Sequence, residues 1–186
     1  MPPIQPIHLN EIHPMLVHFP IALLLASVVL DLLAALTLRC SLADAAFICL
    51  FLGVIGAAAA GLTGPLAEQV PNVNAAGTLL HWHKLFAYAT VAVFGLLLVA
   101  RIIWSLPRLT EALGQTLPER IKMRYPTRLP RLAVTGYLLL ALLGSGLLGA
   151  TGYFGGAMVY DRGVGTHMTV ATPSDHVRAT NPQPQP

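Results

Sequence analysis

Four long apolar stretches determine what this chain can fold into. They run over residues 14–38, 44–64, 83–104 and 131–154. Each supplies roughly the 20 residues that an α-helix needs to cross the hydrocarbon layer of a bilayer, which is about 30 Å thick. Lipid offers no hydrogen-bond partners, and a helix satisfies its backbone groups internally. The stretches therefore predict an all-α integral membrane protein, a bundle of four transmembrane helices.

The composition agrees with this class. Hydrophobic residues make up 55% of the chain and charged residues 10%, whereas about 25% of a soluble domain is charged. No Lys or Arg precedes Arg39, so the basic segment of a cleavable signal peptide is missing and we expect the first stretch to be a transmembrane helix. We expect an N-terminal periplasmic segment at 1–13, one membrane domain at 14–168, and a disordered, Pro-rich tail at 169–186.

The basic residues divide unevenly between the two ends of such a bundle. The end with connections 39–43 and 105–130 carries Arg39, Arg101, Arg108, Arg120, Lys122, Arg124, Arg128 and Arg131. The end with both termini carries Lys84, Arg162 and Arg178. Positive charge favours the cytoplasmic side. The sequence therefore predicts a basic cytoplasmic loop at 105–130 and both termini on the periplasmic side of a bacterial inner membrane. Topology thus explains the net charge of +3 without a nucleic-acid partner.

All seven histidines fall on the predicted periplasmic side: His8, His13, His18, His81, His83, His167 and His176. Two of them open the first span and two open the third, while His167 follows the fourth. Five imidazoles can therefore meet in one layer of the membrane. Imidazole is a common ligand of haem iron, copper and zinc.

A non-covalent haem needs two axial ligands on facing helices at matched depth. His18 lies about 6 Å below the start of span one, at roughly 1.5 Å per residue, and His83 begins span three. We therefore predict His18 and His83 as the metal ligands of haem b. We expect His13, His81 and His167 to be substitutes or hydrogen-bond donors to the propionates. Copper, zinc or no cofactor at all are the alternatives, since each histidine could also simply cap a helix or face headgroups.

Two stripes of small residues leave the question of a cofactor slot open. They comprise Gly53, Ala57, Gly61 and Gly64 in span two, and Ser145, Gly149, Gly152 and Gly156 in span four. Such stripes could border a flat macrocycle, but they are also the usual device for close helix packing in membranes.

Asp31 is the only acidic residue well inside a span, and an intramembrane carboxylate marks a functional-site candidate. It lies about 25 Å below Pro14, and Arg101 lies about 27 Å below His83, at roughly 1.5 Å per residue. We therefore predict an Asp31–Arg101 ion pair that joins spans one and three. A proton path or a quinone site is the alternative.

Other chemistries find no support. Cys40 and Cys49 form no Cys-x-x-Cys-His motif, which excludes covalent c-type haem. No serine–histidine–acid set, P-loop or His-Glu-x-x-His motif is present.

The opening segment 13–21 (HPMLVHFPI), with Asp31 in the same span, resembles the opening signature of the domain of unknown function 2231 family of bacterial membrane proteins. The ending 152–160 (GYFGGAMVY) is also similar, and the resemblance covers about residues 12–168. It implies a four-helix membrane domain and, by association, respiratory electron transfer with haem. His83 matches the family's histidine at the third span, whereas His81 is an extra imidazole.

These observations together predict a membrane-embedded b-type cytochrome subunit, an electron carrier rather than an enzyme. It would pass electrons between a periplasmic cytochrome c or dehydrogenase and quinone or a larger respiratory complex. The alternative is a cofactor-free anchor or assembly subunit of a larger complex or homo-oligomer.

Overall fold

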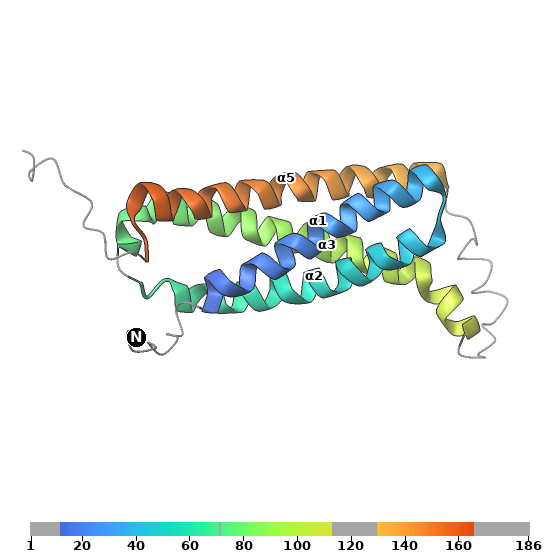
Figure 1. Cartoon of the computed structure of the whole chain (residues 1–186), viewed down its shortest axis with the longest axis horizontal. Coiled ribbons are helices and arrows are strands. Elements are labelled where there is room, and N and C mark those ends of the chain that lie inside the picture. The colour runs from blue at the N-terminus through green and yellow to red at the C-terminus, as the bar shows by residue number, and fades with distance from the viewer. Residues whose placement is uncertain (1–11, 71, 113–129, 166–186) are drawn as a thin grey trace, which may run out of the picture.

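The computed structural model describes residues 12–70, 72–112 and 130–165. Four long helices occupy these ranges: α1 (Ile12–Thr37), α2 (Cys40–Ala67), α3 (Gly77–Ala112) and α5 (Arg131–Arg162) (Figure 1). A short 3-10 helix, η2 (Val73–Ala76), precedes α3. All four long helices have the length and apolar composition needed to cross a membrane. The predicted fold class, an all-α bundle of four transmembrane helices, is confirmed.

The helices extend beyond the apolar stretches at most ends. α3, for example, begins at Gly77 and continues to Ala112, into the segment predicted as a loop. Hydropathy marks the part of a helix that lies in hydrocarbon, but the backbone ladder continues where flanking residues are more polar. The predicted tail 169–186, most of the loop 105–130, and the histidines His8, His167 and His176 lie outside the described residues.

Local signals explain two of the helix ends. Leu38 adopts a φ of 57°, which ends α1 and reverses the chain toward Cys40. Gly163 adopts a φ of 62° at the end of α5, and its N–H donates to the carbonyl of Val159 at 3.0 Å. Glycine is favoured at such a left-handed helix cap because it has no Cβ.

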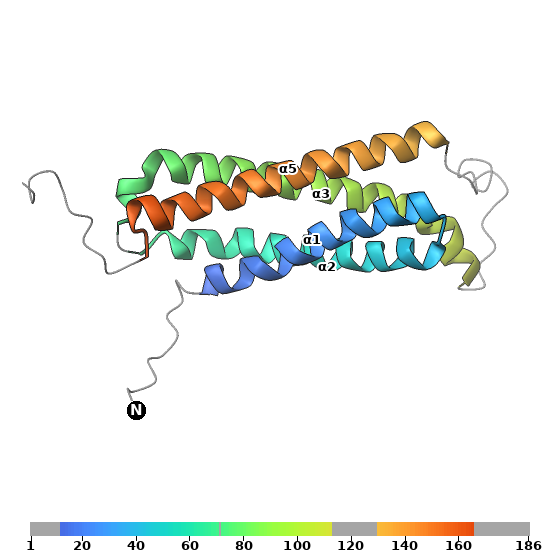
Figure 2. The ribbon, with the colours of Figure 1, turned by 45° about the horizontal axis from the view of Figure 1, so that its top comes forward.

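The helices pack most extensively as two antiparallel pairs, α1 with α2 and α3 with α5, which Figure 2 shows side by side. A glycine allows the close approach in each pair. A Cβ at Gly53 would lie 2.7 Å from Leu24 Cδ2, and one at Gly144 would lie 3.1 Å from Phe94 Cε2. Small residues at these positions therefore serve helix packing, as membrane interfaces commonly do.

Large apolar side chains cover the outside of the bundle as well as its centre. Leu24, Leu50 and Phe94 are fully buried between the helices, while Leu62 is 81% and Leu132 is 84% exposed. A soluble monomer rarely presents an apolar surface of this extent. The exposed faces are suited to lipid, and a bilayer environment follows from the same four helices.

The bundle has two chemically different ends. We call the end with the start of α1, the end of α2, the start of α3 and the end of α5 the histidine end. The opposite end, which contains Asp31 and Arg101, is the aspartate end. Figure 1 shows α1 crossing the bundle obliquely between them, from α2 at the histidine end toward α5 at the aspartate end.

Candidate functional site

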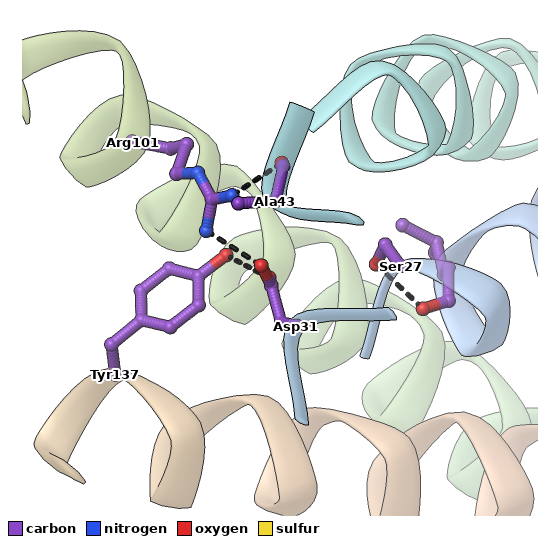
Figure 3. Close-up of polar contacts among 6 residues, drawn as sticks. Ser27, Asp31, Ala43, Arg101 and Tyr137 are labelled. Atoms are coloured by element: carbon purple, nitrogen blue, oxygen red, sulfur yellow. Dashed lines mark hydrogen bonds and ion pairs between the residues drawn. The ribbon is translucent and has the colours of Figure 1, made fainter. Parts of the chain in front are cut away.

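A hydrogen-bonded network at the aspartate end joins all four long helices (Figure 3). Asp31 of α1 is 6% exposed, and its Oδ1 accepts a hydrogen bond from Arg101 Nη1 of α3 at 2.7 Å. The carboxylate Oδ2 accepts from the hydroxyl of Tyr137 of α5 at 2.9 Å. Arg101 Nη2 donates to the carbonyl of Ala43 of α2 at 2.6 Å. The predicted Asp31–Arg101 ion pair is confirmed and extends to two further helices.

Aromatic rings surround the charged pair. The Arg101 guanidinium lies over the Tyr137 ring, 5.7 Å from its centroid, and the Trp104 ring lies 5.4 Å from that of Tyr137. Cation–π contact strengthens such an arrangement when water is excluded. Both carboxylate oxygens have protein partners from other helices, so the network joins the helices and stabilises the bundle. The geometry therefore favours a structural role for Asp31 over a role in a proton path or a quinone site.

Tyr137 was not predicted from the sequence as a partner of Asp31, although the depth of its side chain in the bundle could have indicated it. Asp31 lies six residues before the end of α1, and Tyr137 lies six residues after the start of α5. At roughly 1.5 Å per residue, both side chains lie about 9 Å inside the same end of the bundle. A depth count on the fourth span would have placed this hydroxyl beside the carboxylate.

At the histidine end, His13 of α1 is fixed against α2. Its Nδ1 lies 3.0 Å from the carbonyl of Ala60 and 3.2 Å from Thr63 Oγ1. Since a carbonyl only accepts, the Nδ1 carries the proton and Nε2 keeps the lone pair. The nearest atom to a Cβ at Gly64 would be His13 Cε1, at 3.9 Å. A small residue thus lies beside the half-buried ring.

His83 of α3 is fixed against α5 in the same way. Its Nδ1 donates to the carbonyl of Thr151 at 2.9 Å. A Cβ at Gly155 would lie 3.3 Å from His83 Cε1 and 3.4 Å from Nδ1. A side chain at this position would therefore crowd the imidazole ring, and glycine leaves room for it. The hydroxyl of Thr151 donates to its own helix at Leu147, 2.9 Å away. Again Nε2 is the nitrogen with the lone pair.

The two imidazoles come from different helix pairs at the same end of the bundle. An Nδ1–H donated to a backbone carbonyl is the arrangement that fixes the tautomer and ring orientation of metal-binding histidines. Within the ranges that the structure describes, no protein group bonds either Nε2. This donor set, two oriented imidazoles with available Nε2 atoms, suits a pair of axial haem ligands.

The other candidate histidines are placed differently. His18 is exposed, and its Nδ1 bonds the carbonyl of Pro14 in its own helix at 2.8 Å. It lies five residues after His13, hence about 140° around the helix. His81 is exposed and meets the Trp82 ring edge-on at 5.8 Å. The structure therefore fixes His13 and His83 against neighbouring helices at the same end of the bundle, while His18 and His81 lie on outer faces and His167 lies outside the described residues.

The small-residue stripes take several roles. Gly53 serves packing, Gly64 lies beside His13, and Gly149 and Gly152 face open space. Gly155, which belongs to neither stripe, lies against His83. No group of three or more His, Cys, Asp or Glu side chains suited to a metal ion occurs among the residues described.

A buried charge network at one end and oriented imidazoles at the other, within four apolar helices, define a small multi-pass membrane protein. Residues 10–168 match the model of a family described as predicted membrane protein (DUF2231), and the chain belongs to that family. A search of curated proteins and a search of solved structures each found no match.

Proposed function

We propose that this protein is a b-type cytochrome subunit, in which Nε2 of His13 and Nε2 of His83 would hold haem b at the histidine end. One observation carries the proposal. Each helix pair presents one imidazole whose Nδ1 proton is already donated to a backbone carbonyl, at Ala60 and at Thr151. Ligands oriented before the cofactor binds lose little further freedom when it does.

We choose His13 rather than His18 because the two imidazoles lie on different sides of helix α1. His13 is half-buried and bonded to α2, whereas His18 is exposed and bonded only to its own helix turn. Two imidazoles also favour haem over zinc, because a structural zinc site almost always has four protein ligands and a catalytic one three. Gly155 avoids crowding at His83, because a Cβ there would lie 3.3 Å from the ring.

Bound haem would supply reversible one-electron transfer. The chain would hold it between the two helix pairs, orient its ligands and tune its potential through the carbonyl hydrogen bonds on Nδ1. The excess of Lys and Arg in the sequence toward the opposite end supports a periplasmic position for the histidine end. Electrons would then pass between a periplasmic cytochrome c or dehydrogenase and quinone or a larger respiratory complex, with the protein acting as a carrier in a bacterial inner membrane.

Visible absorption of the purified protein tests the proposal. After expression with ample haem, we expect a Soret band and a sharp reduced α-band from the wild type. His13→Ala and His83→Ala should each abolish the low-spin spectrum, while His18→Ala and His81→Ala, the matched controls, should retain it.

Two results would overturn this assignment. A folded but colourless wild type would refute haem binding and favour the cofactor-free anchor or assembly subunit, unless metal analysis found copper or zinc. A low-spin spectrum that survives in His13→Ala but is lost in His18→Ala would show that His18 is the ligand of span one. Gel filtration of each variant separates loss of haem from loss of folding.

A further inference from the structure

The four long helices form two helix pairs of the same construction. The first helix pair is α1 with α2, and the second is α3 with α5. Figure 1 shows that α1 and α3 both start at the histidine end and that α2 and α5 both end there. Between the pairs, α2 contacts α3 and α1 contacts α5. Exchanging the two pairs turns one of these contacts into the other, as expected for two repeats related by a pseudo-twofold axis along the bundle.

The leading helices of the two pairs, α1 and α3, carry matching residues at matching positions. His13 and His83 each donate the Nδ1 proton to a carbonyl of the partner helix. A fully buried apolar side chain follows 11 residues later in each helix, namely Leu24 in α1 and Phe94 in α3. An offset of 70 residues therefore relates α3 to α1.

The returning helices, α2 and α5, match in the same way. Gly53 and Gly144 each lie in close contact with the fully buried apolar side chain of the partner helix. Seven residues later, Ala60 and Thr151 supply the carbonyls that accept the histidine hydrogen bonds, and another glycine follows four residues after each. An offset of 91 residues therefore relates α5 to α2. Most of the matched residues differ in type, so their equivalence becomes visible only through their contacts.

Asp31 and Arg101 occupy equivalent positions in these two repeats. Each lies 18 residues after the carbonyl-bonded histidine of its own helix. Their side chains also contact each other, with Arg101 Nη1 2.7 Å from Asp31 Oδ1 (Figure 3). Equivalent positions of two units face each other only where the twofold axis passes between them. The ion pair therefore lies at the pseudo-twofold axis.

This position makes the signs of the two charges decisive for which helix pairs can associate. If the first helix pair packed in this arrangement against a copy of itself, the Asp31 carboxylate would meet a second carboxylate. If the second helix pair did so, two Arg101 guanidinium groups would meet. Juxtaposed like charges are strongly disfavoured, above all where water is excluded. Specific partners are commonly selected by such repulsion as well as by attraction.

We propose that Asp31 and Arg101 are the specificity-determining residues by which the first helix pair recognises the second, in the same chain or in a second copy, and rejects a copy of itself. The interaction surface is the inner face of each helix pair. The partner that fits it is a helix pair with the opposite charge at the axis. This role goes beyond joining the helices, because a neutral pair of side chains could fill the same space without selecting a partner. It does not depend on haem.

Charge reversal in a single chain tests the equivalence of the two positions. Arg101→Asp and Asp31→Arg each place like charges at the axis and should strongly lower the unfolding midpoint in detergent. The two substitutions together should restore most of the wild-type midpoint, because equivalent positions face each other in the same way after exchange. Tyr137 has Ala46 as its counterpart 91 residues earlier, but its hydroxyl can accept from a guanidinium as well as donate. A reversed chain as unstable as the single variants would overturn the equivalence.

Co-expression of two full-length chains with different epitope tags tests the selection of partners. The acidic chain carries Arg101→Asp and the basic chain carries Asp31→Arg. Exchange of helix pairs between them opposes unlike charges in both resulting bundles. We expect the acidic and basic chains to co-purify about tenfold more than two acidic or two basic chains do, since a factor of ten needs only about 1.4 kcal/mol.

A neutral chain with Asp31→Asn and Arg101→Met is the matched control. It should co-purify with the acidic or the basic chain no more than like-charged chains co-purify with each other. Equal co-purification of opposite-charge and like-charge mixtures would overturn the proposal. Capture of the neutral chain as strong as that of the opposite-charge partner would also overturn it, because association would then be independent of charge.

Discussion

The two ends of the bundle use buried polar groups in opposite ways. At the aspartate end, the carboxylate of Asp31 receives hydrogen bonds from two other helices, and Arg101 reaches a third. At the histidine end, His13 and His83 bond only within their own helix pair. Among the described residues, no protein group bonds the Nε2 atom of either ring. A network whose donors and acceptors bond to one another stabilises the fold. Oriented imidazoles whose Nε2 lone pairs have no protein partner among the described residues are suited to bind a ligand.

The largest effect is expected at the aspartate end. Arg101→Met leaves the Asp31 carboxylate buried without its cation, and breaking a buried pair in this way costs about 3–5 kcal/mol. Denaturant unfolding in detergent micelles measures the loss. The double variant Asp31→Asn with Arg101→Met should recover most of it, because no uncompensated charge remains. An Arg101→Met protein as stable as the wild type would remove the basis for calling this end a structural lock.

Tyr137→Phe should have the second-largest effect, because one oxygen of Asp31 loses its donor. A hydrogen bond to a charged group contributes about 1.5–3 kcal/mol. Tyr153→Phe on the same helix is the control, since the Tyr153 side chain is exposed. The same unfolding experiment compares the two. Equal stability of both variants would mean that the phenol merely fills space beside Arg101.

The histidines should matter much less to the stability of haem-free protein. His13→Phe and His83→Phe keep a ring of similar size but lose one interhelix hydrogen bond, which in membrane proteins contributes about 0.6 kcal/mol on average. His81→Phe, on an outer face, is the control. A loss in haem-free protein as large as that of Arg101→Met would show that both ends are structural and would abolish the distinction between them.

The smallest effect is expected for the surface ion pair that links α2 to α3 at the histidine end. Lys84 Nζ lies 2.7 Å from Glu68 Oε1, and both side chains are partly exposed. Exposed pairs contribute about 0.2–1 kcal/mol, and salt screens them. Lys84→Met should therefore lower stability slightly at low salt and not at high salt. A large, salt-independent loss would indicate that this pair clamps the two helix pairs together.

Depth along a helix could be read from the sequence, and direction around it could not. Counting residues placed Asp31 beside Arg101 correctly, and the same count applied to the fourth span would have reached Tyr137. The rotation of α1 about its axis, however, decides whether His13 or His18 faces the other helices. That rotation is set by packing such as Leu24 against Gly53, which involves a second helix. The acceptors that orient the imidazoles are backbone carbonyls, which every residue has, so the sequence does not show which of them accept these hydrogen bonds.

The most direct test of the contrast is the thermal unfolding of the protein with and without added haem, in three forms: wild type, Arg101→Met and His13→Phe. Haem at 100 times its dissociation constant should stabilise a protein that binds it by about 2.7 kcal/mol. We predict that Arg101→Met starts from a lower Tm but gains as much stability from haem as the wild type does. His13→Phe should start near the wild-type Tm and gain nothing. A full haem-induced rise in His13→Phe would contradict the account.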